Sequence, residues 1–560
     1  MRNFKKLICF IIVFTSASCS KEWLELEQPG NNDKPYFVNA STAFEAVIAA
    51  YDVQAWRMNV VSLWAVGSVM SDDAVKGGES PGDQQGMYDC MNFNATPNTD
   101  VPSWIWGDLY RMIARASFAI DILIEQDASG DYNISMDESL RNRYIAECRF
   151  LRGYCYFRLV RNFGGVMLYT SAEEDGTTHG SDLSNTRATL DEVYAQVEAD
   201  LLFASQYLPA TVPINEQGRA TKGAADGLLA KTYLYQQKWG QAKIQCEAVM
   251  NSSVGYGLEP NYSDIFSSGK QWGQEVVYSL HMVEDPDGNW GEHEGSWLSI
   301  WFGDRDMGWG YGFRCPTTDF VNAFEPGDSR LDASVVFDGE QIPGVFGGAP
   351  HDFTGGSWNP PTGFMGQKYL IPDSERPVTA DCNGNLDYIF LRYADILLMH
   401  AEASMELYTP DLTWDPASEV ADPYLIAARS SISQVRTRAN LGAVGDSLII
   451  DFDNNGDPVK AFFAYPNDNT IATYKEKYLL NHEDLKAVIF HERRVELGLE
   501  SDRFYDLVRW GDAATVFQNF DDNGQTYGKT NYVIGCSELL PIPAGDINAS
   551  NGAIEQNPCY

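Results

Sequence analysis

The feature that most constrains this chain is a pair of helical segments at residues 220–250, which meet at a tight turn, Trp239-Gly240. Apolar and small side chains recur in both segments at steps of three or four, which is typical of amphipathic helices. One such pair cannot bury its own apolar face, so several pairs must stack, as in tetratricopeptide repeats. The same periodicity recurs at residues 42–59, 103–124, 143–160, 190–207, 391–408, 423–438 and 482–499. The sequence therefore predicts a mainly α-helical protein of stacked tetratricopeptide-like helix pairs.

A large loop-rich insertion interrupts this pattern. Between residues 251 and 389, Gly, Pro, Asp and Trp are frequent and periodic runs are short. An ordered stretch of this kind is usually functional, so we expect a ligand to bind there. Residues 71–100 and 451–473 are turn-rich on a smaller scale. We divide the chain into a signal peptide (1–18), an N-terminal helix-pair region (19–250), the insertion (251–389) and a C-terminal helical region (390–560).

The charge balance argues against nucleic acid as a partner. The 560 residues include 78 acidic and 40 basic side chains, a formal net charge of -38. A surface of this charge repels polyanions and lacks the clustered cations that release counterions from nucleic acid. The content of 44% hydrophobic and 13% aromatic residues also excludes a disordered chain.

The N-terminus has the pattern of an export signal. Basic residues precede an apolar stretch at residues 7–14, and small residues then lead into Cys19. Eight apolar residues rise only about 12 Å as a helix, which is too short to cross a membrane. A cysteine at this place is typical of lipoprotein processing, in which the thiol of Cys19 is acylated and anchors the mature chain. Ser16 stands where an aliphatic residue is usual, so cleavage without lipidation is the alternative.

Eight cysteines follow Cys19, and none forms a CxxC motif. Cys148 and Cys155 are about 10.5 Å apart along a helix, beyond the reach of a disulfide, so we expect two buried thiols. Cys536 and Cys559 could be bridged, but the sequence does not decide this.

The metal-binding patterns are incomplete. Glycine at position 456 fits the sixth position of a calcium loop whose candidate ligands are Asp451, Asp453, Asn455 and Asp457. The twelfth position, which should supply a bidentate Glu, is Phe462. We therefore favour a polar turn, with calcium as the alternative, and expect no cofactor. His491 begins an HExxH-like segment that lacks the second histidine.

Residues 289–313 of the insertion concentrate aromatic rings and glycines. Large flat rings on a glycine-rich backbone suit a surface platform, because the apolar faces of sugar rings stack on such rings. The alternative is that the rings pack the insertion onto the helices beneath it. The candidate ligand-binding residues are Trp290, Trp297, Trp301, Arg305, Trp309 and Tyr311. Trp272, Trp358 and Trp106 are the candidates in reserve.

Three stretches resemble one known family. Residues 391–403 resemble its RYADVLLMYAEA helix, and residues 492–511 resemble its RRxEL and ExxRxxDLxRWG segment. Residues 540–543 and 556–558 look like its LLPIP and QNPGY ending, with Cys559 where glycine is usual. Residues 104–117 resemble a further helix motif, so the likeness extends over most of the chain. The chain thus resembles the SusD/RagB family of outer-membrane nutrient-binding lipoproteins of Bacteroidetes.

The resemblance implies a non-enzymatic glycan-binding lipoprotein, anchored to the outer membrane and facing the cell exterior. It also implies a SusC-like TonB-dependent transporter as the partner that receives the glycan. The alternatives are a protein of the same fold that binds peptide or another nutrient, and a secreted glycoside hydrolase. We interpret the charged motif residues as a structural ion-pair network that locks two helices. They are Glu492, Arg493, Arg494, Glu496 and Arg503.

Overall fold

The computed structural model is mainly α-helical, as predicted. It describes residues 36–124, 134–170, 186–284, 295–306, 310–354, 358–377, 383–409, 422–441, 448–452, 458–463 and 482–560. The N-terminal helices are α2 (Ala40–Ala55), α3 (Arg57–Gly67), α4 (Gln85–Met91), α5 (Asp100–Ile124), α6 (Glu138–Phe163), α7 (Leu190–Tyr207), α8 (Lys222–Tyr235) and α9 (Trp239–Met250). The C-terminal helices are α13 (Tyr393–Leu407), α15 (Pro423–Arg438), α17 (His482–Leu497), α18 (Arg503–Trp510), α19 (Ala513–Gln518) and α20 (Ala544–Ala549).

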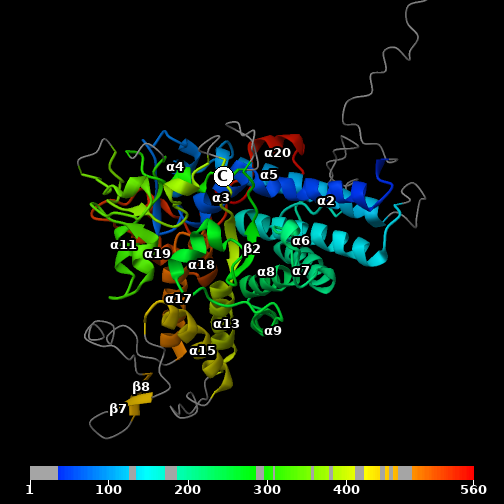
Figure 1. Cartoon of the computed structure of the whole chain (residues 1–560). Helices are drawn as coiled ribbons and strands as arrows, with labels where there is room; N and C mark the ends of the chain where they lie inside the picture. Colours follow the sequence, from blue (N-terminus) through cyan, green and yellow to red (C-terminus); the bar gives the residue numbers. More distant parts are fainter. Residues whose placement is uncertain are drawn as a thin grey trace, which may run out of the picture.

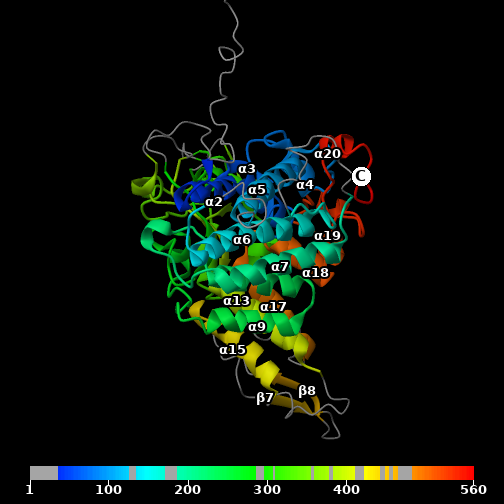
Figure 2. The same ribbon diagram turned by 90° about the vertical axis from the view of Figure 1, so that its right-hand side faces the viewer.

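The long helices form one continuous stack. α5 packs on α6, α6 on α7, α7 on α8 and α8 on α9, and α13 then joins α9 to α15 and α17. Figure 2 shows α6, α7, α9 and α15 one below another. The pair α8 and α9 is the helix pair predicted at residues 220–250. Stacking of neighbouring pairs buries the apolar faces that no single pair could cover.

Local sequence signals set several helix ends. Thr189 and Glu192 form a capping box at the start of α7, and the Thr221 side chain accepts from the Ala224 N–H at the start of α8. Asp422 caps α15, whose first residue is proline. α6 ends at Gly164, whose φ of 73° a residue with a side chain would adopt only under strain.

The insertion consists of short elements. Its helices are η5 (Tyr262–Phe266), η6 (Ser268–Lys270), α10 (Leu298–Phe302), α11 (Thr318–Asn322), α12 (Arg330–Ser334), η7 (Phe346–Gly348) and η8 (Asp373–Glu375). The remaining 3-10 turns are η4 (Ile214–Glu216) and η9 (Lys529–Asn531).

The described part of the chain contains four antiparallel two-stranded sheets, the first two of which join segments far apart in sequence. They pair β1 (Ala74–Gly77) with β3 (Phe313–Pro316), β2 (Val276–Leu280) with β6 (Tyr388–Arg392), β4 (Val335–Val336) with β5 (Met365–Gly366), and β7 (Leu448–Phe452) with β8 (Pro458–Phe463). In the first of them, Val75 lies opposite Cys315. The last is a hairpin in a region predicted to be only turn-rich. Figure 1 shows it at the lower end of the molecule, beyond α15 and α17.

The largest apolar core extends through much of the helix stack and the insertion, from Phe37 to Ile554, and two smaller clusters lie beside it. It includes Trp64 of α3 together with Trp301 and Phe302 of α10. The insertion is therefore packed into the helical scaffold, because its own aromatic rings complete the core.

All five residues of the predicted charge network form ion pairs, but with partners from much of the chain. Glu492 and Glu496 both bond Arg330, at 2.5 and 2.9 Å. The other pairs are Glu492 with Arg436, Glu496 with Arg392 and Arg438, Arg493 with Asp395 and Asp506, Arg494 with Asp72, Asp73 and Asp319, and Arg503 with Asp72. The network thus joins the start of the chain, the insertion and the C-terminal helices, which is wider than the two helices expected.

Cys536 and Cys559 are bridged by a disulfide, the pairing that the sequence left open. Cys148 and Cys155 are buried free thiols, as predicted, and Cys90, Cys246 and Cys315 are too.

Several predicted site residues fall outside the described residues. Among them are Cys19 and the calcium candidates Asp453, Asn455 and Asp457, and only the backbone of Asp451 is described. Within the described ranges, no cluster of three or more His, Cys, Asp or Glu side chains is arranged to hold a metal ion. None of the helices in that part of the chain is long and apolar enough to cross a membrane.

Candidate functional site

A charged and aromatic surface lies where the insertion meets the loop after β1. We call it the Arg305 surface, and it consists of Glu79, Asp83, Arg305 and Tyr311, with the buried Trp358 beneath it. Arg305 donates from Nη2 to Glu79 Oε2 at 3.1 Å and from Nη1 to the Tyr311 carbonyl at 3.1 Å. Asp83 Oδ2 lies 3.6 Å from Arg305 Nη1. The Glu79 side chain is 75% exposed, so it can exchange its guanidinium partner for a ligand hydroxyl.

Close backbone contacts build this surface. The Gly78 N–H donates to the Gly312 carbonyl at 2.8 Å, and the Trp358 indole N–H donates to the Gly78 carbonyl at 3.1 Å. A Cβ on Gly312 would lie 2.2 Å from the Trp358 ring, and its φ is +65°. Only glycine fits there. The insertion and the loop after β1 are therefore held in a fixed relation to each other.

Lys76 stabilises the loop after β1 through hydrogen bonds. Its Nζ donates to the carbonyls of Ser80 and Asp83, and the ammonium lies 5.2 Å from the Phe313 ring. Burial lowers the pKa of Lys76 to about 8, although the nearby Asp83 opposes this shift. The loop thus owes its shape to a buried cation as well as to its glycines.

The prediction that the aromatic cluster forms an exposed platform is wrong for Trp297 and Trp301. Their exposed fractions are 8% and 4%. The Trp301 ring lies 5.7 Å from that of Trp64 and 4.9 Å from that of Phe313, centroid to centroid. Both tryptophans sit at or beside α10, which turns them toward α3, so they pack the insertion onto the helices, the alternative weighed above.

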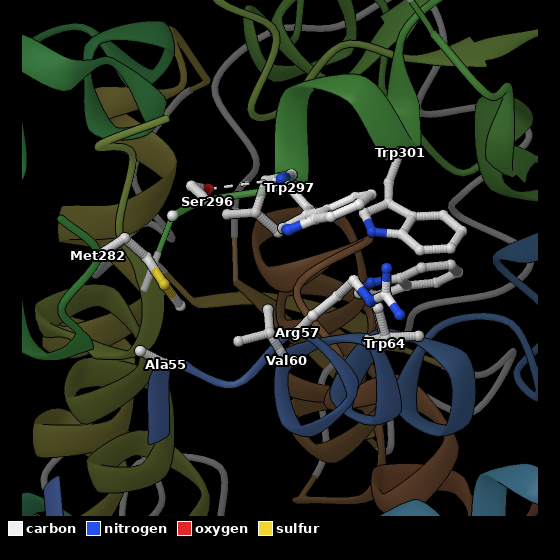
Figure 3. A pocket seen from close by; sticks show the side chains of 11 residues that line it. Ala55, Arg57, Val60, Trp64, Met282, Ser296, Trp297 and Trp301 are labelled. Atoms are coloured by element: carbon white, nitrogen blue, oxygen red, sulfur yellow. Dashed lines mark hydrogen bonds between the residues drawn. The ribbon is translucent and has the colours of Figure 1, made fainter. Parts of the chain in front are cut away.

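These two tryptophans line a small crevice between α10 and α3, which we call the α3–α10 crevice. Figure 3 shows their rings facing Arg57 and Trp64 of α3. The crevice holds about 10 Å³. This is room for a single water-sized group.

The remaining aromatic candidates divide by position. Tyr311 is half-buried and belongs to the Arg305 surface, whereas Trp290 and Trp309 lie outside the described residues. Among the reserve candidates, Trp106 and Trp358 are buried and Trp272 is 40% exposed. The Trp272 ring packs edge-on against the His281 ring, with 5.2 Å between the ring centroids. Neither residue belongs to the Arg305 surface.

Sequence reasoning missed Glu79, Asp83 and Lys76. The sequence features near these residues were the Gly77-Gly78 pair and the turn-rich segment after it. These features predict a loop but do not show which part of the chain the loop contacts. Pairing of β1 with β3 brings this loop to the insertion across more than two hundred residues of chain.

The chemistry available at the Arg305 surface is recognition by hydrogen bonding. Carboxylates, a guanidinium and a phenol ring can bond hydroxyl groups and cover an apolar sugar face. Arg305 is shared between Glu79, Asp83 and the Tyr311 carbonyl, so both acids already have a cation beside them.

A second, larger groove of about 920 Å³ lies between residues 256–260, Tyr393 and α15. Hydroxyl and amide side chains of α15 line much of it, including Ser430, Gln434 and Thr437.

Two family models match the chain. One is described as the SusD family and matches residues 267–560, and the other as "Starch-binding associating with outer membrane" and matches residues 22–234. Among curated relatives, SusD-like protein P25 of Formosa agariphila is 25% identical over 475 residues, covering 81% of this chain and 78% of the relative. A SusD-like protein of Bacteroides ovatus is 23% identical over 534 residues, covering 91% and 83%.

Solved structures share the fold. A laminarin-binding SusD-like protein superposes with a TM-score of 0.71 at 25% identity, covering 94% of this chain and 100% of the other. Surface glycan-binding protein A of Bacteroides thetaiotaomicron, in complex with laminarihexaose, gives 0.69 at 21% identity, covering 93% and 100%.

Proposed function

This chain belongs to the SusD family, and from that premise we propose that it captures an oligosaccharide or polysaccharide at the cell surface and delivers it to a SusC-like TonB-dependent transporter. The observation that carries the glycan-binding part is the Arg305 surface, where exposed and half-buried polar groups surround an aromatic ring. Similarity to a laminarin-binding protein over 94% of this chain supports a glycan as the ligand.

Membrane attachment through Cys19 is part of the same proposal. The basic, apolar and small residues before Cys19 support lipidation, and the matching model described as associating with the outer membrane supports the location. The transporter partner rests on family membership.

We propose that the protein binds its glycan without cleaving it. A glycoside hydrolase needs two carboxyl groups about 5–10 Å apart, one of them able to donate a proton at the working pH. At the Arg305 surface, Glu79 and Asp83 lie 3.1 and 3.6 Å from the same guanidinium, so both carboxyl groups are on one cation rather than on opposite sides of a bound sugar.

Calorimetric titration of the mature chain with a panel of neutral and acidic oligosaccharides tests this proposal. We expect binding to at least one of them, and roughly tenfold weaker binding in Arg305→Ala, because a charge-assisted hydrogen bond is lost. Chromatography after long incubation should recover the sugar unchanged. Lys222→Ala, an exposed lysine on α8 paired with Asp226, is the matched control and should bind like the parent.

Binding of peptides with no saccharide bound would replace glycan by peptide as the ligand. Shortened sugar products would instead identify a hydrolase. If Arg305→Ala binds the glycan as tightly as the parent, the glycan site does not lie at the Arg305 surface.

A further inference from the structure

The groove between residues 256–260, Tyr393 and α15, which we call the α15 groove, is large enough for an extended ligand. It holds about 920 Å³, within the roughly 300–1,000 Å³ that is usual for ligand-binding clefts. Figures 1 and 2 both place α15 toward the lower end of the molecule, whereas α3 and α4, which flank β1 in sequence, lie near the top. None of the lining residues belongs to the Arg305 surface. The α15 groove is therefore a separate place on the protein.

One buried carboxylate holds the two walls of the groove together. Glu275 is fully buried, and its Oε2 accepts from the Glu259 N–H of one wall at 2.7 Å and from Arg438 Nη1 of α15 at 3.1 Å. Its backbone carbonyl accepts from the Tyr393 N–H at 2.7 Å. Each wall thus has a fixed place, so a ligand would not lose affinity by having to order the walls.

The charged side chains of the lining already have partners inside the protein. Glu259 accepts from Lys270 Nζ at 3.0 Å, and Arg438 pairs with two buried glutamates. Arg429 is 3% exposed and donates from Nε to the Leu425 carbonyl at 3.2 Å. These charges are engaged within the protein, so the groove favours a neutral ligand over an ionic one.

Neutral hydrogen-bonding groups form the exposed face of α15 in the groove. Ser430, Gln434 and Thr437 follow at steps of four and three, so they lie on one side of the helix, and all three are exposed. Gln434 Nε2 donates to the Ser430 carbonyl at 3.4 Å, and Thr437 Oγ1 donates to the Ser433 carbonyl at 2.6 Å. The Gln434 amide oxygen and the Thr437 hydroxyl oxygen can therefore accept hydrogen bonds from ligand hydroxyls.

Apolar groups lie in the same groove. Tyr256, Leu258 and Pro260 contribute them from one wall, and the exposed Ile426 contributes one from α15. A sugar ring combines hydroxyl groups around its edge with apolar C–H faces, which pack on aromatic and aliphatic side chains. The lining therefore matches a neutral sugar in both of its chemical aspects.

We propose that the α15 groove is a second glycan-binding site, which takes a neutral oligosaccharide segment. An extended peptide commonly binds by pairing with a strand edge. The residues that line the groove lie instead on a loop, on α15 and at the first residue of α13. This inference rests on the proposed function only in taking a glycan as the ligand, since the Arg305 surface contributes nothing to the groove.

Calorimetric titration of the mature chain with laminarihexaose, maltohexaose, mannohexaose and xylohexaose tests the inference. We expect two molecules of at least one of these neutral hexasaccharides to bind per chain. The double variant Gln434→Ala and Thr437→Ala should weaken one of the two binding events roughly tenfold, because two hydrogen bonds are lost. Ser430→Arg, whose long side chain would occupy part of the groove, should weaken the same event. Arg305→Ala should weaken the other.

The double variant Thr515→Ala and Gln518→Ala is the matched control. These residues are also exposed, three positions apart on a helix, α19, and they line neither the groove nor the Arg305 surface. This variant should bind the hexasaccharide like the parent at both sites. A melting curve shows that each variant is folded.

One hexasaccharide per chain, weakened by Arg305→Ala alone, would overturn the inference and leave the proposed function standing. Parent-like binding at both sites in the α15 double variant and in Ser430→Arg would also overturn it. One hexasaccharide per chain that only the α15 variants weaken would support the inference and make the groove the main glycan site.

A casein digest is titrated in parallel as a peptide probe. Binding of these peptides that Ser430→Arg abolishes, with no saccharide in the groove, would overturn the inference and assign the groove to peptide. If no saccharide binds to the parent at all, the inference and the proposed function fail together.

Discussion

A carboxylate buried in an apolar interior is stable only when cations surround it, and Glu496 has three. Its side chain is fully buried and accepts from Arg330, Arg392 and Arg438. Burial opposes its ionisation, but the three guanidiniums outweigh this effect and hold the pKa of Glu496 well below its usual range. The carboxylate is therefore charged at neutral pH.

Replacing Glu496→Gln should lower the free energy of unfolding by about 3–5 kcal/mol, because three arginines lose their shared anion in a buried site. Urea denaturation measures this. Asp319→Asn is the control, since Asp319 pairs with Arg494 of the same network but is 60% exposed. It should change the stability by no more than about 1 kcal/mol. Equal losses in the two variants would show that burial of the network contributes little.

Buried lysines make stability depend on pH above neutrality. Lys529 donates to the carbonyls of Val69 and Ser71, and burial lowers its pKa to about 7. Burial also lowers the pKa values of Lys76 and Lys368 to about 8. In the unfolded chain these lysines keep their protons to about pH 10, so between pH 7 and 10 these three groups bind more protons in the unfolded state and their contribution to stability rises with pH.

The free energy of unfolding should accordingly rise by on the order of 2 kcal/mol between pH 7 and 8.5. Above that range the rise should stop, because burial raises the pKa of thiols such as Cys315 to about 12 while unfolded thiols ionise from about 8.5. Urea titrations at half-unit steps measure the curve. Lys529→Met should show a smaller rise, and a flat parent curve would contradict the prediction.

At the scale of elements, α10 shows what the sequence can and cannot predict. The ring and glycine content of residues 289–313 predicted an aromatic segment but not the side to which each ring points. That depends on Trp64 of α3, which is more than two hundred residues away and meets Trp301 only in the folded protein. The helices themselves were predicted well, because their periodicity is local, whereas contacts between distant segments leave no local signal.

The same distinction separates the two parts of the candidate site. Arg305 and Tyr311 were found because the insertion is unusual in composition. Glu79 and Asp83 were missed because acidic residues in a turn are common in a chain with 78 of them. Similarly, the charged residues of α17 predicted ion pairs but could not name Asp72 or Arg330 as partners.

Truncating Trp301→Ala should lower the free energy of unfolding by about 3–5 kcal/mol, since it leaves a cavity in the core between α10 and α3. Tyr311→Ala, at the edge of the same cluster and half-buried, should lose less and should instead weaken glycan binding. Thermal melting and calorimetric titration of both variants measure the two effects. If Trp301→Ala melts like the parent but binds the glycan poorly, the Trp301 ring contacts the glycan and does not serve mainly to pack the core.

At the scale of the whole molecule, the C-terminal tail closes the structure. Asn557 donates to the carbonyls of Phe163 and Leu540, and Arg187 donates to its side-chain oxygen at 2.7 Å. The disulfide between Cys536 and Cys559 closes a loop of sequence separation 23 around these contacts. The tail is thus fixed both covalently and by hydrogen bonds to the end of α6.

Removing this bridge in the double variant Cys536→Ser and Cys559→Ser should lower the free energy of unfolding by about 3 kcal/mol, through the greater entropy of the unfolded chain. Urea denaturation of parent and variant, each with and without reductant, measures this. Reductant should affect the parent alone, because the other described thiols are buried and free. An equal response of the variant to reductant would place the effect at another cysteine.

Anchoring should depend on a single thiol. Cys19→Ala is expected to move the protein from the membrane to the soluble fraction, because the variant lacks the thiol that we propose carries the lipid. Fractionation of cells that express either form measures this, with Cys9→Ala, inside the signal peptide, as the control that should stay anchored. Retention of the Cys19→Ala protein in the outer membrane would contradict lipidation at this residue.

The wide ion-pair network also has a kinetic consequence. Asp72 and Asp73 meet Arg494 and Arg503 only after more than four hundred further residues have been added to the chain. Contacts between such distant residues form slowly, because the entropy of closing a long loop is lost before any attraction is gained. A chain that leaves the ribosome from its N-terminus therefore carries these acids without their cations until residues 494 and 503 have emerged. Only then can this part of the fold be completed.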